Sequence, residues 1–125
     1  MIKKTKKKSI FINTGIINIY TTFNNTIITA SSVYGNTIAW SSCGAKGFKG
    51  AKKNTPFAAQ LATESVCKKI IDQGIKTVEI RIKGPGIGRD SSLRAIINSG
   101  IKLTIIRDVT GIPHNGCRPP KKRRV

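Results

Sequence analysis

Acidic residues are scarce in this chain. Five Asp and Glu stand against 23 Lys and Arg, for a formal net charge of +18, and none of the acids precedes Glu64. They are scattered along the sequence as Glu64, Asp72, Glu79, Asp90 and Asp108. Metal-dependent nucleases and related enzymes need several carboxylates close together. We therefore expect no catalytic residue here, and we expect Glu79 and Asp108 to serve as ion-pair partners on neighbouring strands.

Histidine and cysteine are also too few and too dispersed to suggest a site. The single histidine is His114, and the cysteines are Cys43, Cys67 and Cys117, with no Cys-x-x-Cys pair. Structural zinc sites use paired cysteines at short spacing, so we expect no metal and no other cofactor. An odd number of widely spaced cysteines favours reduced thiols over disulfides.

Long apolar runs are missing as well. No stretch approaches the 18 or so apolar residues that would span a bilayer. The basic start, Met1 to Lys8, is not followed by the apolar core of a signal peptide and lacks the pattern of an import signal. We expect a protein that works in the compartment where it is made.

Positive charge gathers in three segments, residues 1–9, 44–53 and 111–125. We expect the first to be disordered until it meets a partner, and the last, stiffened by prolines, to be an extended basic arm. In the middle segment, Phe48 either stacks on a base or sugar or pins the loop to the core. So large a charge calls for a polyanionic partner, with nucleic acid first and a membrane surface second. The chain lacks the strongly amphipathic basic helix that favours a membrane surface.

A glycine-rich loop, Lys83-Gly-Pro-Gly-Ile-Gly-Arg-Asp90, joins a strand pattern to a helix pattern. It lacks the Lys-Ser/Thr of a P-loop and the glycine spacing of a dinucleotide site. We expect bare backbone amides in the turn and a side-chain cap from Asp90 or Ser91. The loop then either presents a helix start and Arg89 to a phosphate backbone, or serves only to pack a strand tightly against a helix.

The alternation of apolar residues predicts an α/β fold of order βββαβαβ. Strands are expected over residues 15–23, 26–32, 37–42, 77–83 and 101–107. Thr55 and Pro56 should begin the first helix and Gly74 should end it. The apolar faces should include Ile70 and Ile71 in this helix, and Leu93, Ile96 and Ile97 in the second. We expect one domain over residues 10–110, a mixed sheet with helices packed on it, and basic extensions at both ends.

Several motifs together resemble the family of small-subunit ribosomal protein eleven, of the bacterial and organellar type. The resemblance covers residues 15–125 and rests on Phe23–Thr26, Trp40–Ser42, Gly47–Gly50, Thr55–Gln60, Lys83–Asp90, Leu93–Ala95 and Pro113–Val125. The chain departs from the family at Gly111, where proline is usual, and in its shorter lysine-rich start.

The resemblance implies a ribonuclease H-like topology without the nuclease site. It also implies a structural role in the small ribosomal subunit, on the platform beside the messenger exit and the E site. Neighbours there would include ribosomal proteins of families seven, eighteen and twenty-one, with no membrane contact and no homo-oligomer. An RNA chaperone acting off the ribosome is the alternative.

The residues expected to contact ribosomal RNA are mostly basic and lie in the three charged segments and the glycine loop. They are Lys3, Lys4, Lys6, Lys7, Lys8, Lys46, Phe48, Lys49, Lys52, Lys53, Arg89, Arg94, His114, Asn115, Arg118, Lys121, Lys122, Arg123 and Arg124. A bias toward Ile, Lys and Asn indicates an AT-rich genome, and Arg107–Thr110 resembles plastid sequences. We expect a plastid ribosome, with a mitochondrion or a low-GC bacterium as alternatives.

Overall fold

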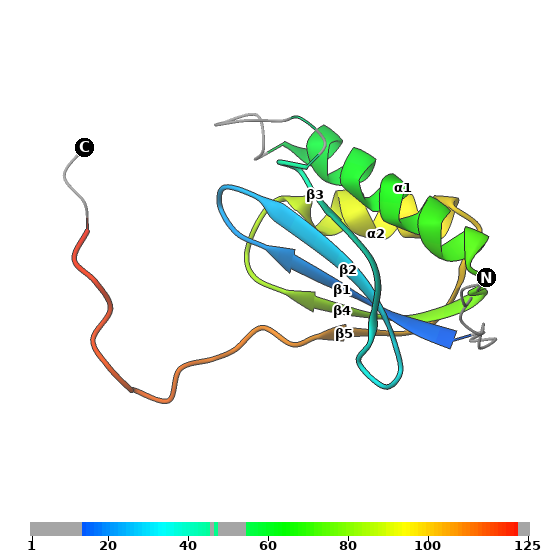
Figure 1. Cartoon of the computed structure of the whole chain (residues 1–125). Coiled ribbons are helices and arrows are strands. Elements are labelled where there is room, and N and C mark those ends of the chain that lie inside the picture. Colours follow the sequence, from blue (N-terminus) through cyan, green and yellow to red (C-terminus); the bar gives the residue numbers. More distant parts are fainter. Residues whose placement is uncertain (1–13, 46, 48–54, 123–125) are drawn as a thin grey trace, which may run out of the picture.

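Five strands and two helices follow one another in the predicted order βββαβαβ (Figure 1). The structure is a computed structural model and describes residues 14–45, 47 and 55–122. The elements are β1 (Thr14–Thr21), β2 (Thr26–Ser32), β3 (Thr37–Ser42), α1 (Pro56–Asp72), β4 (Thr77–Lys83), α2 (Gly88–Asn98) and β5 (Lys102–Asp108). The predicted strand and helix order is confirmed.

The strands form one mixed sheet in the order β3-β2-β1-β4-β5. The first three strands make an antiparallel meander, because short turns join them. The strands β4 and β5 run parallel to their neighbours, since a helix crosses over before each of them. The mixed sheet of ribonuclease H-like topology predicted from the sequence is therefore confirmed.

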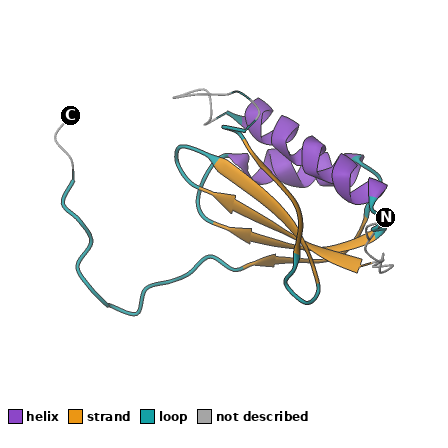
Figure 2. Ribbon diagram, viewed as in Figure 1, coloured by secondary structure: helices purple, strands orange, loops and turns teal. Residues whose placement is uncertain are grey.

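Both helices cover the same face of this sheet (Figure 2). The core lies between the two layers, where Ile17, Ile19 and Ile80 of the sheet are fully or almost fully buried together with Val66 and Ile96 of the helices. Alternation along the strands explains this arrangement, because every second side chain points toward the helices. We call the opposite side of the sheet the open face.

The ends of α1 match the sequence signals. Thr55 Oγ1 accepts a hydrogen bond from the Ala58 amide at 3.2 Å, and Pro56 occupies the first turn. Gly74 follows the helix with a φ of +93°, a conformation in which a Cβ would be strained. The expected cap of α2 by Asp90 or Ser91 is wrong, because α2 begins earlier, at Gly88, after an Ile87 that makes no side-chain cap bond.

Two apolar positions were placed on the wrong side of their helices. Ile71 is 44% exposed and Ile97 is 55% exposed, whereas Ile70 and Ile96 are fully buried. Consecutive helical residues lie about 100° apart, so only one residue of each adjacent pair faces the sheet squarely. Within the described residues, no helix has the length and apolar content needed to cross a membrane.

Candidate nucleic-acid interface

The glycine loop lies against the end of β1 so closely that side chains would not fit. A Cβ on Gly84 would lie 1.9 Å from the Thr21 carbonyl oxygen, and one on Gly86 would lie 2.4 Å from the Thr22 carbonyl oxygen. A Cβ on Gly88 would lie 2.3 Å from Thr26 Oγ1. The three glycines therefore allow a close backbone approach that joins β4, α2 and the β1–β2 hairpin.

Two backbone amides of this loop are not bare, contrary to the expectation. The Gly86 amide donates to Thr21 Oγ1 at 2.9 Å, and the Gly84 amide donates to Thr110 Oγ1 at 3.1 Å. Both acceptors belong to the protein itself, so these donors are already satisfied before any anion approaches. The geometry supports the packing interpretation of the loop.

Arg89 takes part in the same packing. Its guanidinium donates to the Gly84 carbonyl at 2.7 Å and to Asp108 Oδ2 at 3.0 Å. The Arg89 side chain is still 31% exposed, so its outer edge remains open to a ligand. Arg94, one turn further along α2, is exposed.

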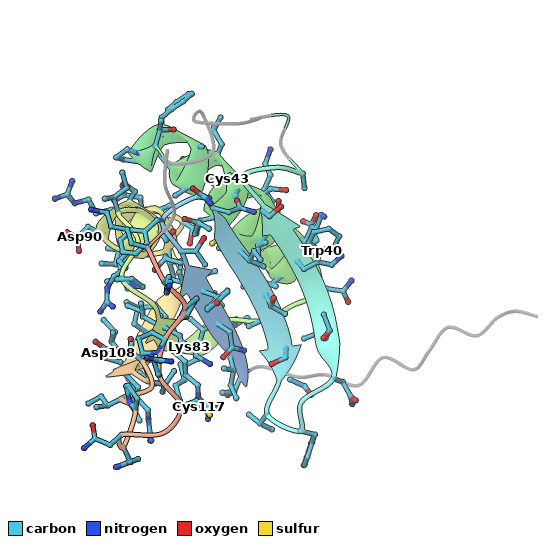
Figure 3. The ribbon with its side chains drawn as sticks, turned by 90° about the vertical axis from the view of Figure 1, so that its left-hand side faces the viewer. Trp40, Cys43, Lys83, Asp90, Asp108 and Cys117 are labelled. Atoms are coloured by element: carbon cyan, nitrogen blue, oxygen red, sulfur yellow. The ribbon has the colours of Figure 1, made fainter. Side chains whose placement is uncertain are left out.

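Asp108, labelled in Figure 3, ties the end of β5 to this cluster through its bonds with Arg89 and Thr110. Its Oδ1 accepts hydrogen bonds from the Thr110 hydroxyl at 2.6 Å and the Thr110 amide at 3.0 Å. These two bonds, followed by the bond from Arg89, lower the pKa of Asp108 to about 2. The Val109 amide also donates to the Ile82 carbonyl at 2.8 Å. Residues 108–110, which we call the arm root, are thus held against β4 and the glycine loop.

Beyond the arm root the chain leaves the domain (Figure 1). Residues 111–122 form no helix or strand, and every one of them is exposed. Asn115 has a φ of +63°, which asparagine tolerates better than most residues. The expected contact residues His114, Asn115, Arg118, Lys121 and Lys122 all lie on this exposed segment. An extended chain with several cations and no acid can follow a phosphate backbone.

The other expected contact residues lie outside the described residues. They are Lys3, Lys4, Lys6, Lys7, Lys8, Lys46, Phe48, Lys49, Lys52, Lys53, Arg123 and Arg124. The two interpretations of Phe48, base stacking and anchoring of the loop, therefore both stay predictions.

The acids of the sheet act as ion-pair partners. Glu79 lies 2.9 Å from Arg81 and 3.2 Å from Arg107, while Asp108 pairs with Arg89. Glu79 and Asp108 do not face each other, because the register pairs Glu79 with Ile105 and Asp108 with Ile82. Each acid is thus held by arginine rather than by the other acid.

Histidines, cysteines and acids do not gather in threes anywhere in the part of the chain that the structure describes. Cys43 and Cys67 are buried and Cys117 is exposed, and none of the three forms a disulfide bond. Burial raises the pKa of Cys67, which keeps this thiol protonated and unreactive. The site therefore offers cations and hydrogen-bond donors rather than a reaction centre.

Sequence reasoning missed Thr110, and for Asp108 it predicted an ion pair but not the hydrogen bonds to Thr110 that fix the arm root. The Asp-x-Thr spacing of an Asx turn was a usable signal, since an aspartate there accepts from the amide two residues on. No sequence pattern signals the hydrogen bond from Arg89 to Asp108, because it depends on how α2 and β5 pack.

Comparison with known proteins extends these observations to a family. The family model described as Ribosomal protein S11 matches residues 15–124. A small ribosomal subunit protein uS11c of Zygnema circumcarinatum is 58% identical over 125 residues, covering 100% of this chain and 94% of that protein. The protein of the same name in Mesostigma viride is 57% identical over 124 residues, covering 99% of this chain and 93% of its own length. The chain therefore belongs to the ribosomal protein S11 family, whose members are structural constituents of the small ribosomal subunit rather than enzymes.

Proposed function

We propose that this chain binds ribosomal RNA in the platform of the small subunit, near the messenger exit and the E site, and supports assembly there. The observation that carries this proposal is the exposed arm, in which Arg118, Lys121 and Lys122 follow a root fixed to the folded domain. The family of the chain and its charge of +18 point to the same polyanion.

The mechanism we propose is structural: the folded domain positions basic segments against the RNA. Lysines and arginines of the arm neutralise packed RNA phosphates and release counterions, which supplies most of the affinity. The folded domain, residues 10–110, holds the arm in a fixed register through the arm root. The basic residues 1–9 and the loop 44–53 add further phosphate contacts. Arg94 contributes from α2, and Arg89 through the exposed edge of its guanidinium.

The same family relationship supports the location that we propose in the subunit. The neighbouring proteins we propose are those of ribosomal families seven, eighteen and twenty-one, which the chain joins as a single copy. Both relatives are named uS11c, the chloroplast form, in agreement with the plastid ribosome expected from the sequence.

A salt titration against small-subunit RNA tests the electrostatic part. With about eight phosphate contacts, the slope of log affinity against log salt should be roughly −6 to −7. In the variant Lys121→Gln/Lys122→Gln the slope should become shallower by about 1.4 to 1.8, or about 0.7 to 0.9 per lost contact. The matched control Lys68→Gln/Lys69→Gln, on the exposed side of α1, should keep the original slope.

Sucrose-gradient sedimentation at moderate and high salt tests the assembly part. The proposal requires the chain to sediment with small subunits and to prefer small-subunit RNA to unrelated RNA. Equal affinity for unrelated RNAs with no cosedimentation would instead establish an RNA chaperone. A salt slope near zero would refute the phosphate-contact mechanism itself.

A further inference from the structure

The open face of the sheet carries an ordered row of polar and aromatic side chains. Residues paired across adjacent strands point to the same face, so the registers define one row that crosses all five strands. It runs Trp40, Thr29, Asn18, Arg81 and Arg107. A second row, one pair further along the strands, runs Ser42, Ile27, Tyr20 and Lys83.

Two aromatic rings on this face are open to solvent. Trp40 is 57% exposed and Tyr20 is 44% exposed, although both belong to strands of the sheet rather than to loops. The Lys83 ammonium lies 5.9 Å from the centre of the Tyr20 ring, within the range of a cation–π contact. Figure 3 shows Trp40 on the β3 side and Lys83 on the β4 side of the sheet. The face thus offers aromatic surfaces on one side and cations on the other.

The charge on this face is positive. The strands β4 and β5 direct Arg81, Lys83, Lys102 and Arg107 to it, and the only acid among their open-face positions is Glu79. That acid is held by two of these arginines. The helices on the other face carry Glu64, Asp72 and Asp90, which are all exposed. The open face therefore favours a polyanion more than the helical face does, because on the helices these three acids are interspersed with the cations Lys68, Lys69, Arg89 and Arg94.

We propose that unpaired nucleotides of the small-subunit RNA lie across the open face, with Trp40 and Tyr20 stacking on bases and Arg81 and Lys83 contacting phosphates. The inference rests on the proposed function only for the identity of the RNA. Adjacent strands lie about 4.8 Å apart, so Trp40 on β3 and Arg81 on β4 are separated by roughly 14 Å across the sheet. Sheets that bind single strands through exposed aromatics hold two or three bases over a comparable width.

The first test is oxidative footprinting of three aromatic side chains. Trp40 and Tyr20 are compared with Tyr34, which is 87% exposed in the β2–β3 turn and lies outside the two rows. Oxidation is measured in the free protein, in its complex with naked small-subunit RNA, and in assembled subunits. We expect RNA alone to protect Trp40 and Tyr20 severalfold more than Tyr34.

Substitutions provide the second test. Stacking of a base contributes about 1–3 kcal/mol, so Trp40→Ala should weaken RNA binding about 5- to 150-fold. The salt slope should stay unchanged, because no phosphate contact is lost. Trp40→Phe should recover most of the affinity and Tyr34→Ala should lose none. Lys83→Gln should make the slope shallower by about 0.7 to 0.9. Far-UV circular dichroism and thermal melts confirm that each variant is folded.

Three outcomes would overturn the inference. Protection that occurs in the subunit but not with naked RNA would assign the open face to a neighbouring protein. If Trp40 and Tyr20 stay reactive in both complexes, neither RNA nor protein covers the open face. Equal losses of affinity in Trp40→Ala and Trp40→Phe would remove the role of stacking. Each outcome leaves the arm's salt slope intact, so failure of this inference is distinguishable from failure of the proposed function.

Discussion

Replacing Gly84 by alanine should destabilise the domain by two separate effects. The residue has a φ of +105°, and a Cβ there would lie 1.9 Å from the Thr21 carbonyl oxygen. Forcing a side chain into this backbone conformation costs about 1–3 kcal/mol. Relieving a clash with backbone in a packed region costs about 1–3 kcal/mol more. We therefore expect a loss of about 2–6 kcal/mol, a large part of the roughly 5–15 kcal/mol that stabilises a domain.

Two other glycines separate these effects. Gly74 has a φ of +93° with nothing within 4 Å of its Cβ position, so Gly74→Ala should cost only the conformational strain. Gly111 lies in open space with no positive φ, so Gly111→Ala should change the unfolding free energy by less than about 0.5 kcal/mol. The difference between Gly84→Ala and Gly74→Ala isolates the clash, at about 1–3 kcal/mol.

Urea unfolding followed by circular dichroism measures these differences. With a denaturant slope of about 1–3 kcal/mol per molar, the clash alone should lower the midpoint of Gly84→Ala below that of Gly74→Ala by roughly 1 M. Equal midpoints for these two variants would refute the close packing of the loop on β1. A destabilised Gly111→Ala would show that the arm is packed rather than extended.

The remaining predictions concern the ionisation of Asp108 and the accessibility of the three cysteines. The carboxyl of Asp108 has a pKa of about 2 in the folded protein, below the value of about 3.9 in an unfolded chain. Its contribution to stability is therefore present above pH ~4 and is lost as the pH falls toward 2. The urea midpoint of the unmodified protein should exceed that of Asp108→Asn at pH 6, and the two should converge near pH 2. A gap that stays constant with pH would contradict this assignment. A thiol reagent should label Cys117 quickly in the native protein, and Cys43 and Cys67 only in denaturant, because these two are buried; rapid native labelling of Cys67 would count against the described core.

Local signals in the sequence predicted the fold well. Thr55, Pro56 and Gly74 mark the ends of α1 because capping depends on residues next to each other in the chain. The strands β2, β3 and β4 match their predicted bounds, since alternation is also a short-range pattern. The position of Ile71 was wrong because a helical pattern does not say which of two adjacent apolar residues faces the sheet.

Contacts between distant segments could not be predicted in the same way. Arg89 and Asp108 are 19 positions apart and meet only because α2 packs beside the end of β5. The Gly84 amide and Thr110 Oγ1 are 26 positions apart, and their bond depends on the register between β4 and β5. The open-face row likewise joins five strands whose order in the sheet differs from their order in the chain.

Two roles were predicted for the glycine loop, presenting a helix start and Arg89 to a phosphate backbone or packing a strand against a helix, and its contacts within the protein favour packing. Thr21 and Thr110 accept hydrogen bonds from two amides of the loop, and Asp108 accepts one from the Arg89 guanidinium. A cation paired with a carboxylate attracts a phosphate less than an unpaired one does, because the field of the pair falls off faster with distance. Under the proposed function, the loop therefore contributes to RNA binding mainly by fixing the direction in which the arm leaves. In that proposal the attraction comes from the cations of the arm and of the open face, where Arg81, Lys83, Lys102 and Arg107 share the single carboxylate of Glu79.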